Sequence, residues 1–331
     1  MANWVGSLLV FFVVAAPSGI LRAEWEIERT PLVAFGEEPA LQYGYDSASA
    51  AASYGEPGCV DPGCDTSETS DSELWTPPAR DHGLSIEIGG WATGGLTINA
   101  DGNTSGTGNA PYGYNNVSDG AVLNQLWVYA EKAVDTGGCG ADWGFRADYL
   151  FGVDGPDNQA FGDRSCDFGL NIARDYGSAI PQLYGEMGID DLTVKMGYFL
   201  TIVGWEYSQS PRNFFYSRSY AFYYGEPNTH SGMLASYVLN EDVTVHGGWT
   251  MGMDGTFSNY LHASTFLGGV DLSIGEDTSL YWAVLAGDWG DGTARGGVAG
   301  NDGNVYLNSI VLEHCLSDRW TYVLQHDLGV N

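Results

Sequence analysis

Two arginines stand in a segment, residues 201–230, that is otherwise rich in tyrosine and phenylalanine. They are Arg212 and Arg218, and cations are scarce, since the whole chain has only 12 lysines and arginines. Guanidinium groups that face carboxylates across a narrow aqueous passage create a field that selects solutes by charge. We therefore predict that this segment enters such a passage and narrows it, with Tyr216 and Tyr220 beside the arginines. The alternative is a packed aromatic cap whose arginines are paired for stability.

A second set of polar side chains falls on one face of segments that alternate between apolar and polar residues. If these segments are strands, every second side chain points the same way. The polar faces would then line an aqueous interior, where acids and bases attract or repel passing ions. The predicted interior residues are Arg146, Asp148, Gln182, Glu186, Lys195 and His246.

Catalytic and metal-binding chemistry is poorly supported. His230 and Ser231 lie near Glu226, but adjacent residues of a strand point to opposite faces and make a poor nucleophile–base pair. Asp-, Asn- and Gly-rich pieces such as 99–106 and 154–158 lack the spacing of a calcium loop. The chain has no phosphate-binding glycine motif and no zinc spacing. We predict no enzyme activity, no cofactor and no metal.

Five cysteines are present. Cys59 and Cys64 could close a small disulfide loop in an oxidising compartment, and a metal site at this lone pair is a weaker alternative. The partners of Cys139, Cys166 and Cys315 cannot be deduced, because an odd number leaves one cysteine unpaired or paired between chains.

The same alternation predicts the elements that carry the polar side chains. Residues 143–151 and 243–252 alternate along their whole length. A tilted strand that crosses a membrane needs about 9–11 residues, whereas strands of soluble domains usually have about five or six. The lengths favour membrane-crossing strands.

Eleven strands are predicted, and the connections between them alternate between long and short. Outer-membrane barrels place short turns on one side of the membrane and longer loops on the other, whereas a secreted β-sandwich, the alternative, has no reason to do so. We predict an all-β fold, an antiparallel transmembrane β-barrel. The predicted strands are 84–98, 122–133, 142–151, 181–189, 192–200, 231–239, 243–252, 263–273, 279–288, 304–315 and 320–328.

The turns predict the register. A two-residue loop at 190–191 places Glu186 opposite Lys195, so that opposite charges meet on the polar face. A three-residue loop at 240–242 pairs Tyr237 with Val245. The sequence does not decide which face of the strand 122–133 meets lipid, because both alternating sets of side chains in it include large apolar residues.

Composition limits the partners. With 42 acidic against 12 basic residues, the net charge is −30, which argues against nucleic acid and anionic lipid surfaces. The aromatic content of 13% and the 47 glycines, together with the absence of long apolar runs, suit strands better than a bundle of membrane helices. Because residues 83–331 hold 29 acids against 9 cations, a pore formed by them is expected to prefer cations.

The N-terminus predicts export. Residues 5–16 form an apolar run of signal-peptide length, so residues 1–23 are predicted to be a signal peptide, and a buried strand or helix is the alternative. Residues 24–82 are acidic and rich in Pro, Ser and Ala, which predicts a disordered linker. Residues 83–331 are then the barrel.

One segment, GWEYSQSPRNFFYSRSYAFYYGEPNTHSG at 204–232, is not explained by alternation and resembles a signature of the putative beta-barrel porin-2 family of bacterial outer-membrane proteins. The segments GGWATGGLTIN (89–99) and LNQLWVYAEKAVD (123–135) are similar to the family's first strands. The residues that carry the resemblance are Gly204, Glu206, Asn213, Phe214, Ser217, Tyr220, Gly225, Glu226, Pro227, Thr229, His230 and Gly232.

The resemblance implies a non-catalytic outer-membrane channel for passive diffusion of small hydrophilic solutes. Its partners would be outer-membrane lipid, solutes or ions and, as an open possibility, further copies of the chain. The alternatives are a non-conducting barrel and a secreted sandwich with a binding or adhesive role. Barrels of this kind have an even number of strands, so a chain with eleven is expected to be C-terminally incomplete.

Overall fold

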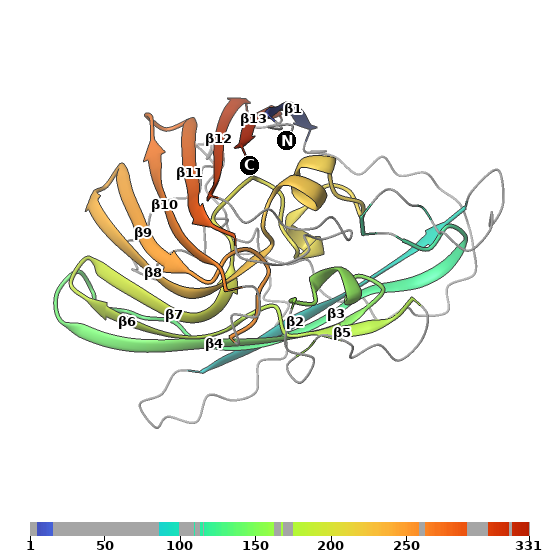
Figure 1. The fold of residues 1–331 in the computed structure, drawn as a ribbon, viewed down its shortest axis with the longest axis horizontal. Helices are drawn as coiled ribbons and strands as arrows, with labels where there is room; N and C mark the ends of the chain where they lie inside the picture. Colours follow the sequence, from blue (N-terminus) through green and yellow to red (C-terminus); the bar gives the residue numbers. More distant parts are fainter. Residues whose placement is uncertain are drawn as a thin grey trace, which may run out of the picture.

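The computed structural model describes residues 5–15, 86–98, 109, 113–114, 116–161, 167, 175–257, 262–289, 304–317 and 320–330. Most of these residues are in antiparallel strands (Figure 1). The strands are β1 Val5–Ala15, β2 Glu87–Thr97, β3 Gly120–Lys132, β4 Ala141–Gly152, β5 Gly177–Ala179, β6 Leu183–Ile189, β7 Leu192–Leu200, β8 Thr229–Asn240, β9 Val243–Thr250, β10 Ser264–Ser273, β11 Thr278–Asp288, β12 Asn304–Ser317 and β13 Trp320–Val330. Three short helical turns are η1 Pro156–Asn158, η2 Ser210–Arg212 and η3 Ala221–Gly225.

One 13-stranded sheet contains every strand. Its order is β1-β13-β12-β11-β10-β9-β8-β7-β6-β4-β3-β2, and β5 pairs with β4 beside this path. The sheet curves around an interior (Figure 1). Within the described residues the end strands β1 and β2 do not pair with each other, so the curved sheet is open there.

All eleven predicted strands are present, as β2 to β4 and β6 to β13, and their ends lie within a few residues of the predicted ones. Alternation of side chains therefore identified the elements correctly. Two further strands are present. β5, a three-residue strand in a long connection, was not predicted, whereas β1 places the apolar N-terminal run against β13 and corresponds to the strand that was the alternative for residues 5–16. Removal of residues 1–23 as a signal peptide stays a prediction.

The predicted register is confirmed at both turns that were used. Glu186 pairs with Lys195, and Tyr237 pairs with Val245. The loop after β8 differs in detail, because a two-residue turn at 241–242 is combined with a bulge at Leu239 rather than forming a three-residue loop. An extra residue in one strand shifts the pairing by one position, so both arrangements give the same register.

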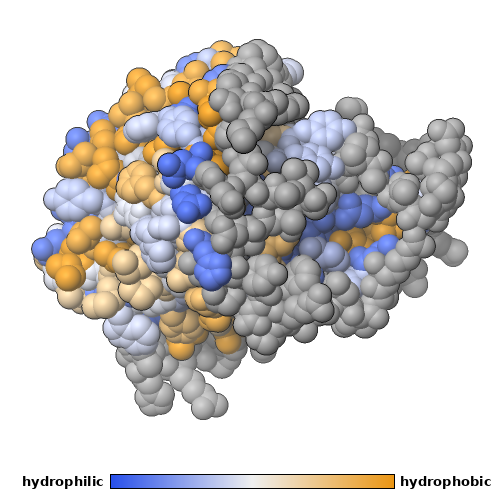
Figure 2. Space-filling view, in the orientation of Figure 1, coloured by the Kyte–Doolittle hydropathy of each residue, from blue (hydrophilic) through white to orange (hydrophobic). Residues whose placement is uncertain are grey.

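The outer face of the sheet is apolar. Leu126 and Val128 are exposed and Trp127 is fully buried, so the face of β3 that carries Leu126 and Val128 is the outer one. Hydrophobic residues recur over the outer side of the strands in Figure 2. Trp143 and Trp320 are exposed at strand ends next to short turns, as expected of side chains at a membrane interface.

The interior is occupied by the connection between β7 and β8, residues 201–228, which we call the inner loop (yellow in Figure 1). Ile202 and Val203 begin it and pack into the apolar cluster on the concave face of the sheet. This contact excludes water from the start of the loop and orients the rest. The members of the cluster are Tyr184, Phe199, Ile202, Val203, Leu234, Leu267, Ala283, Leu285 and Leu307.

Several predictions fall outside the described residues. They are the linker at 24–82, the disulfide between Cys59 and Cys64, the position of Cys166 and the Asn-rich piece at 99–106. Within the described part of the chain, no helix is long and apolar enough to cross a membrane.

Candidate solute pathway

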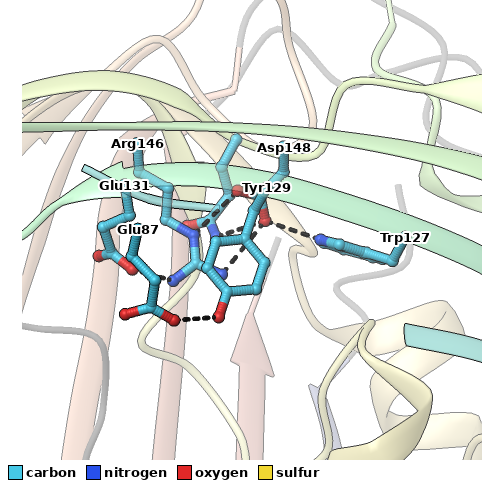
Figure 3. A network of polar contacts seen from close by, with 7 residues as sticks. Glu87, Trp127, Tyr129, Glu131, Arg146 and Asp148 are labelled. Atoms are coloured by element: carbon cyan, nitrogen blue, oxygen red, sulfur yellow. Dashed lines mark hydrogen bonds and ion pairs between the residues drawn. The ribbon is translucent and has the colours of Figure 1, made fainter. Parts of the chain in front are cut away.

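Three of the predicted interior residues form one network on β4 and the residues leading into β6 (Figure 3). Arg146 Nε donates to Asp148 Oδ1 at 2.9 Å, and its Nη1 donates to Glu131 Oε2 at 3.0 Å. Gln182 Nε2 donates to Asp148 Oδ2 at 3.1 Å, and Trp127 Nε1 donates to the same oxygen at 2.9 Å. The carboxylate is therefore held by three donors from three segments.

Glu186 and Lys195 are the next predicted interior residues along the sheet. They are register partners on β6 and β7, and both are buried. Lys195 Nζ lies 4.4 Å from the ring centroid of Tyr184, a distance that suits a cation–π contact. The pair adds one charge of each sign to the interior wall.

His246 lies further along the sheet, on β9. Its Nδ1 is 2.8 Å from Ser236 Oγ and its Nε2 is 3.1 Å from Asp271 Oδ2. All six predicted interior residues are buried and face the concave side of the sheet or its rim. We call them the charged wall: Arg146, Asp148, Gln182, Glu186, Lys195 and His246.

The inner loop is tied to β3 by the side chain of Gln125. Gln125 Nε2 donates to the carbonyl of Ser208 at 2.7 Å, and its Oε1 accepts from the backbone N–H of Ser210 at 3.0 Å. The same amide also contacts Asp154 Oδ2 and Trp91 Nε1, each at 3.0 Å. Gln125 is fully buried, so these contacts are shielded from water.

A second glutamine, Gln325 on β13, ties the loop to the other side of the sheet. Its Oε1 accepts from the backbone N–H of Trp205 at 3.1 Å. Its Nε2 donates to Glu226 Oε1 at 2.5 Å and to Asp327 Oδ2 at 2.7 Å. Because β3 and β13 lie near opposite ends of the strand order, the loop spans the interior.

Arg218 organises the inner loop itself. Its guanidinium donates four hydrogen bonds to carbonyls of that loop, at distances from 2.7 to 3.2 Å, and it lies 4.6 Å from the ring centroid of Tyr114. These contacts support the alternative in which the arginine stabilises a packed loop. The accepting carbonyls are those of Tyr207, Ser208, Phe215 and Tyr216.

The other three predicted constriction residues are less buried than Arg218, and Arg212 is the most buried of the three. The guanidinium carbon of Arg212 lies 3.4 Å from the ring centroid of Tyr207. Tyr216 is half-exposed, and its hydroxyl donates to the carbonyl of Gly94 on β2 at 2.8 Å. Tyr220 is also half-exposed and stacks on Tyr224.

Two carboxyls of the loop are held in low-dielectric surroundings. Burial raises the pKa of Glu206, although the backbone N–H of Ser219 donates to it. Burial raises the pKa of Glu226 well above its usual range, and the neighbouring Asp327 carboxylate adds to this shift. Glu226 is therefore set up to hold a proton at a pH where free carboxyls have lost theirs.

The sequence reasoning missed Gln125 and Gln325, the residues that anchor the loop. Neither has a sequence signal, because an inward glutamine looks the same whether it meets a loop, water or a solute. Glu226 belongs to the segment that carries the family resemblance, and this was the available signal for it.

His230 and Ser231 point to different partners, as expected of neighbours on a strand. His230 contacts Thr201 and the carbonyl of Gly252, whereas Ser231 donates to the carbonyl of Gly255. The described ranges contain no group of three or more His, Cys, Asp or Glu residues arranged to hold a metal. Cys139 and Cys315, the two described cysteines, are not joined in a disulfide.

The family model described as putative beta-barrel porin-2, OmpL-like, matches residues 85–331. No curated protein matches the chain. Among solved structures, the crystal structure of Acinetobacter baumannii OccAB1 is similar, with a TM-score of 0.30 and 12% sequence identity. The similarity covers 69% of this chain and 51% of that chain, so this chain spans about half of that structure's length.

Proposed function

The chain belongs to the putative beta-barrel porin-2, OmpL-like family, and we propose that it is an outer-membrane channel for passive diffusion of small hydrophilic solutes. The observation that carries this proposal is the division of the sheet into two faces. The outer face presents apolar side chains such as Met187 and Phe266, whereas the concave face presents the charged wall. Apolar residues on the lipid side and polar residues on the inner side are what a water-filled barrel requires.

The inner loop is the proposed constriction. Gln125 on β3 and Gln325 on β13 hold it across the interior, so a solute that passes through must pass beside it. The four contacts of Arg218 keep the loop in one shape, while the partly buried Arg212 packs on the ring of Tyr207. The loop therefore narrows the pathway through its backbone position, and its charges add selectivity.

We also propose a preference for cations. Eight acidic side chains are buried in the described part of the chain, against four basic ones, so the acids stay in excess even when Glu226 holds a proton. An interior with excess negative charge raises the local concentration of cations and excludes anions. The acids are Asp148, Asp154, Asp157, Asp167, Glu186, Glu226, Asp254 and Asp327, and the bases are Lys132, Arg146, Lys195 and Arg218.

Single-channel recording in planar bilayers tests this function. We expect discrete, ohmic current steps and, under a KCl gradient, a reversal potential that favours K⁺. In Arg212→Ala/Arg218→Ala, conductance is expected to rise as the loop loosens. Met187→Ala, a change on the lipid side, is the control. Unchanged conductance and selectivity in the arginine variant would refute the constriction.

A non-conducting barrel is the second candidate, and the density of contacts between the inner loop and the sheet favours it. This candidate predicts a folded, heat-modifiable protein that gives no current steps in wild-type form. Release of the loop by Gln125→Leu/Gln325→Leu should then produce conductance. Currents in the wild-type protein would exclude it.

Export and assembly complete the proposal. The apolar run at 5–16 serves as the signal-peptide core, and cleavage after residue 23 places the mature N-terminus in the acidic linker 24–82. N-terminal sequencing of the protein from outer-membrane fractions tests this step. Chemical crosslinking in the same fractions tests homo-oligomer formation, which stays open.

A further inference from the structure

Two carboxyl groups meet where the inner loop reaches β13. Gln325 Nε2 donates to Glu226 Oε1 of the loop at 2.5 Å and to Asp327 Oδ2 of the strand at 2.7 Å. Both acids are buried, with 4% of Glu226 and 8% of Asp327 exposed. The other oxygen of each carboxyl, Glu226 Oε2 and Asp327 Oδ1, is buried and has no donor. One amide therefore joins two acids that are shielded from water.

The surroundings of Glu226 supply no positive charge to balance this pair. Among the described residues, the charged groups that act on Glu226 are Asp327 on β13 and Glu206 in the loop itself, and both are acids. Arg218, the nearest basic group to Glu206, donates to four carbonyls of the loop. A Cβ atom at Gly204 would overlap the Glu226 carboxyl, so backbone packs directly against it. Two ionised carboxylates at this position would repel each other without compensation.

A proton removes this repulsion. Glu226 and Asp327 are close enough to hydrogen-bond directly, and two carboxyl groups form such a bond only when one of them carries a proton. The proton supplies the donor that these buried oxygens otherwise lack. Because burial and the neighbouring carboxylate raise the pKa of Glu226, the proton stays bound at a pH where free carboxyls have lost theirs. The contact between the inner loop and β13 is complete only while this proton is present.

The attachment of the loop to β3 has no such dependence on a proton. Gln125 contacts the carbonyl of Ser208 and the N–H of Ser210, and these backbone groups do not titrate. A rise in pH therefore acts on the attachment to β13 and leaves the attachment to β3 in place. The hydrogen bond from the N–H of Trp205 to Gln325 is also neutral, so release at β13 is a local movement and not a loss of the whole loop.

We propose that Glu226, Gln325 and Asp327 form a proton-dependent latch, which holds the inner loop against β13 in acid and releases that side of the loop in alkali. Loss of the proton to solvent leaves two like charges around one amide, and the loop moves away from β13 to separate them. The passage beside the loop then widens. The latch depends only on the fold, whereas its effect on solute flow rests on the proposed channel function.

Limited proteolysis of the folded protein in detergent, from pH 5 to pH 9, tests the latch. Glu226→Gln should keep the loop attached at every pH, because its amide donates to Asp327 as the protonated acid does. The ratio of wild-type to Glu226→Gln cleavage in the inner loop, taken at each pH, cancels the pH dependence of the protease. We expect this ratio to rise about tenfold or more from pH 5 to pH 9, since each unit of pKa shift corresponds to a factor of about ten in the population of the released form.

Asp327→Asn is the second variant and serves if Glu226→Gln does not fold. It removes one of the two like charges and supplies a donor to Glu226, so its inner loop should also stay protected at pH 9. Asp271→Asn is the matched control, because it removes a carboxylate of β10 that contacts His246 on β9. Cleavage of this control should follow the wild-type protein at every pH.

The outcomes separate the latch from the channel. A ratio that does not change with pH, or faster cleavage in acid, overturns the latch. Loss of heat-modifiable migration at pH 9 also overturns it, because the whole barrel would then unfold. In planar bilayers, wild-type conductance should rise from pH 5 to pH 9 while that of Glu226→Gln stays constant, and equal pH dependence of the two overturns the widening. Cleavage that depends on pH without any current steps overturns the channel and leaves the latch intact.

Discussion

The two buried arginines of the described residues, Arg146 and Arg218, are held in opposite ways. Arg146 on the charged wall donates to the carboxylates of Glu131 and Asp148. Arg218 in the inner loop donates to four backbone carbonyls. An ion pair neutralises charge on a wall that the strands already hold in place, whereas carbonyl contacts define the shape of a segment that has no regular structure. The comparison indicates that the charged wall sets the electrostatic field of the interior and that the inner loop sets the shape of the passage.

Arg218→Leu should have the largest effect on stability. It removes four hydrogen bonds that a charged group donates to the inner loop, which we expect to cost about 3 kcal/mol or more, or roughly 6–12 °C in the unfolding temperature. The temperature at which heat-modifiable migration on a detergent gel is lost measures this. Arg218→Lys should recover little, because an ammonium cannot reproduce the planar fork of donors. Full recovery by lysine would show that charge, not geometry, is what the loop needs.

Gln125→Leu should have the next largest effect. The change leaves the N–H of Ser210 unpaired in a buried site and removes one of the two donors to the carbonyl of Ser208, the other being Arg218. We expect a loss of about 2 kcal/mol together with faster proteolysis of the inner loop. Gln182→Leu on the charged wall is the matched control, because it removes one contact of Asp148 and none of the loop. Equal proteolysis of the two variants would contradict the anchoring role of Gln125.

Much of this arrangement follows from the sequence, because a strand repeats every two residues. Glu186 and Lys195 could be paired from a two-residue turn and their alternation alone, and the pairing is confirmed. The bulge at Asn124 could not be predicted. It lies in the pairing of β2 with β3, where β3 has one extra residue. Two patterns competed beyond it, because Trp127 faces inward although it is as apolar as its outward-facing neighbours. A bulge of this kind is visible only when the partner strand is in place.

The inner loop was recognised as unusual, but its internal contacts could not be predicted. Arg218 was expected to face carboxylates, and its partners are instead carbonyls, which every residue carries. No residue type marks a carbonyl that will be left unpaired by an irregular backbone. Burial in the interior depends on the curvature of the whole sheet. Gln325 is 120 and 99 positions from Trp205 and Glu226, the loop residues that it contacts, so it gave no local signal either.

The loop should also respond to pH through Glu226. Its pKa is raised in the folded protein, so the folded state binds the proton more tightly than the unfolded chain does. This contribution to stability is complete below the ordinary carboxyl pKa and is lost as the pH rises toward the raised value. Glu226→Gln should remove this pH dependence and leave the protein more stable at neutral pH. Unfolding temperatures measured from pH 4 to 8 test this prediction. If the slope of unfolding temperature against pH is unchanged in Glu226→Gln, Glu226 is not the source of the pH dependence.

Lys195→Met should have the smallest effect, and one on selectivity rather than on stability. Lys195 contributes one positive charge to the wall, and one charge acting across about 10 Å of water is worth ~0.4 kcal/mol, or about twofold in the ratio of K⁺ to Cl⁻ permeability. The reversal potential under a KCl gradient should move toward K⁺, and the shift should shrink at high salt because charges are screened. Conductance should stay near the wild-type value, since the inner loop is untouched. A large change in conductance with no change in reversal potential would show that the charged wall sets the width of the passage. This result would contradict the separate roles of the charged wall and the inner loop.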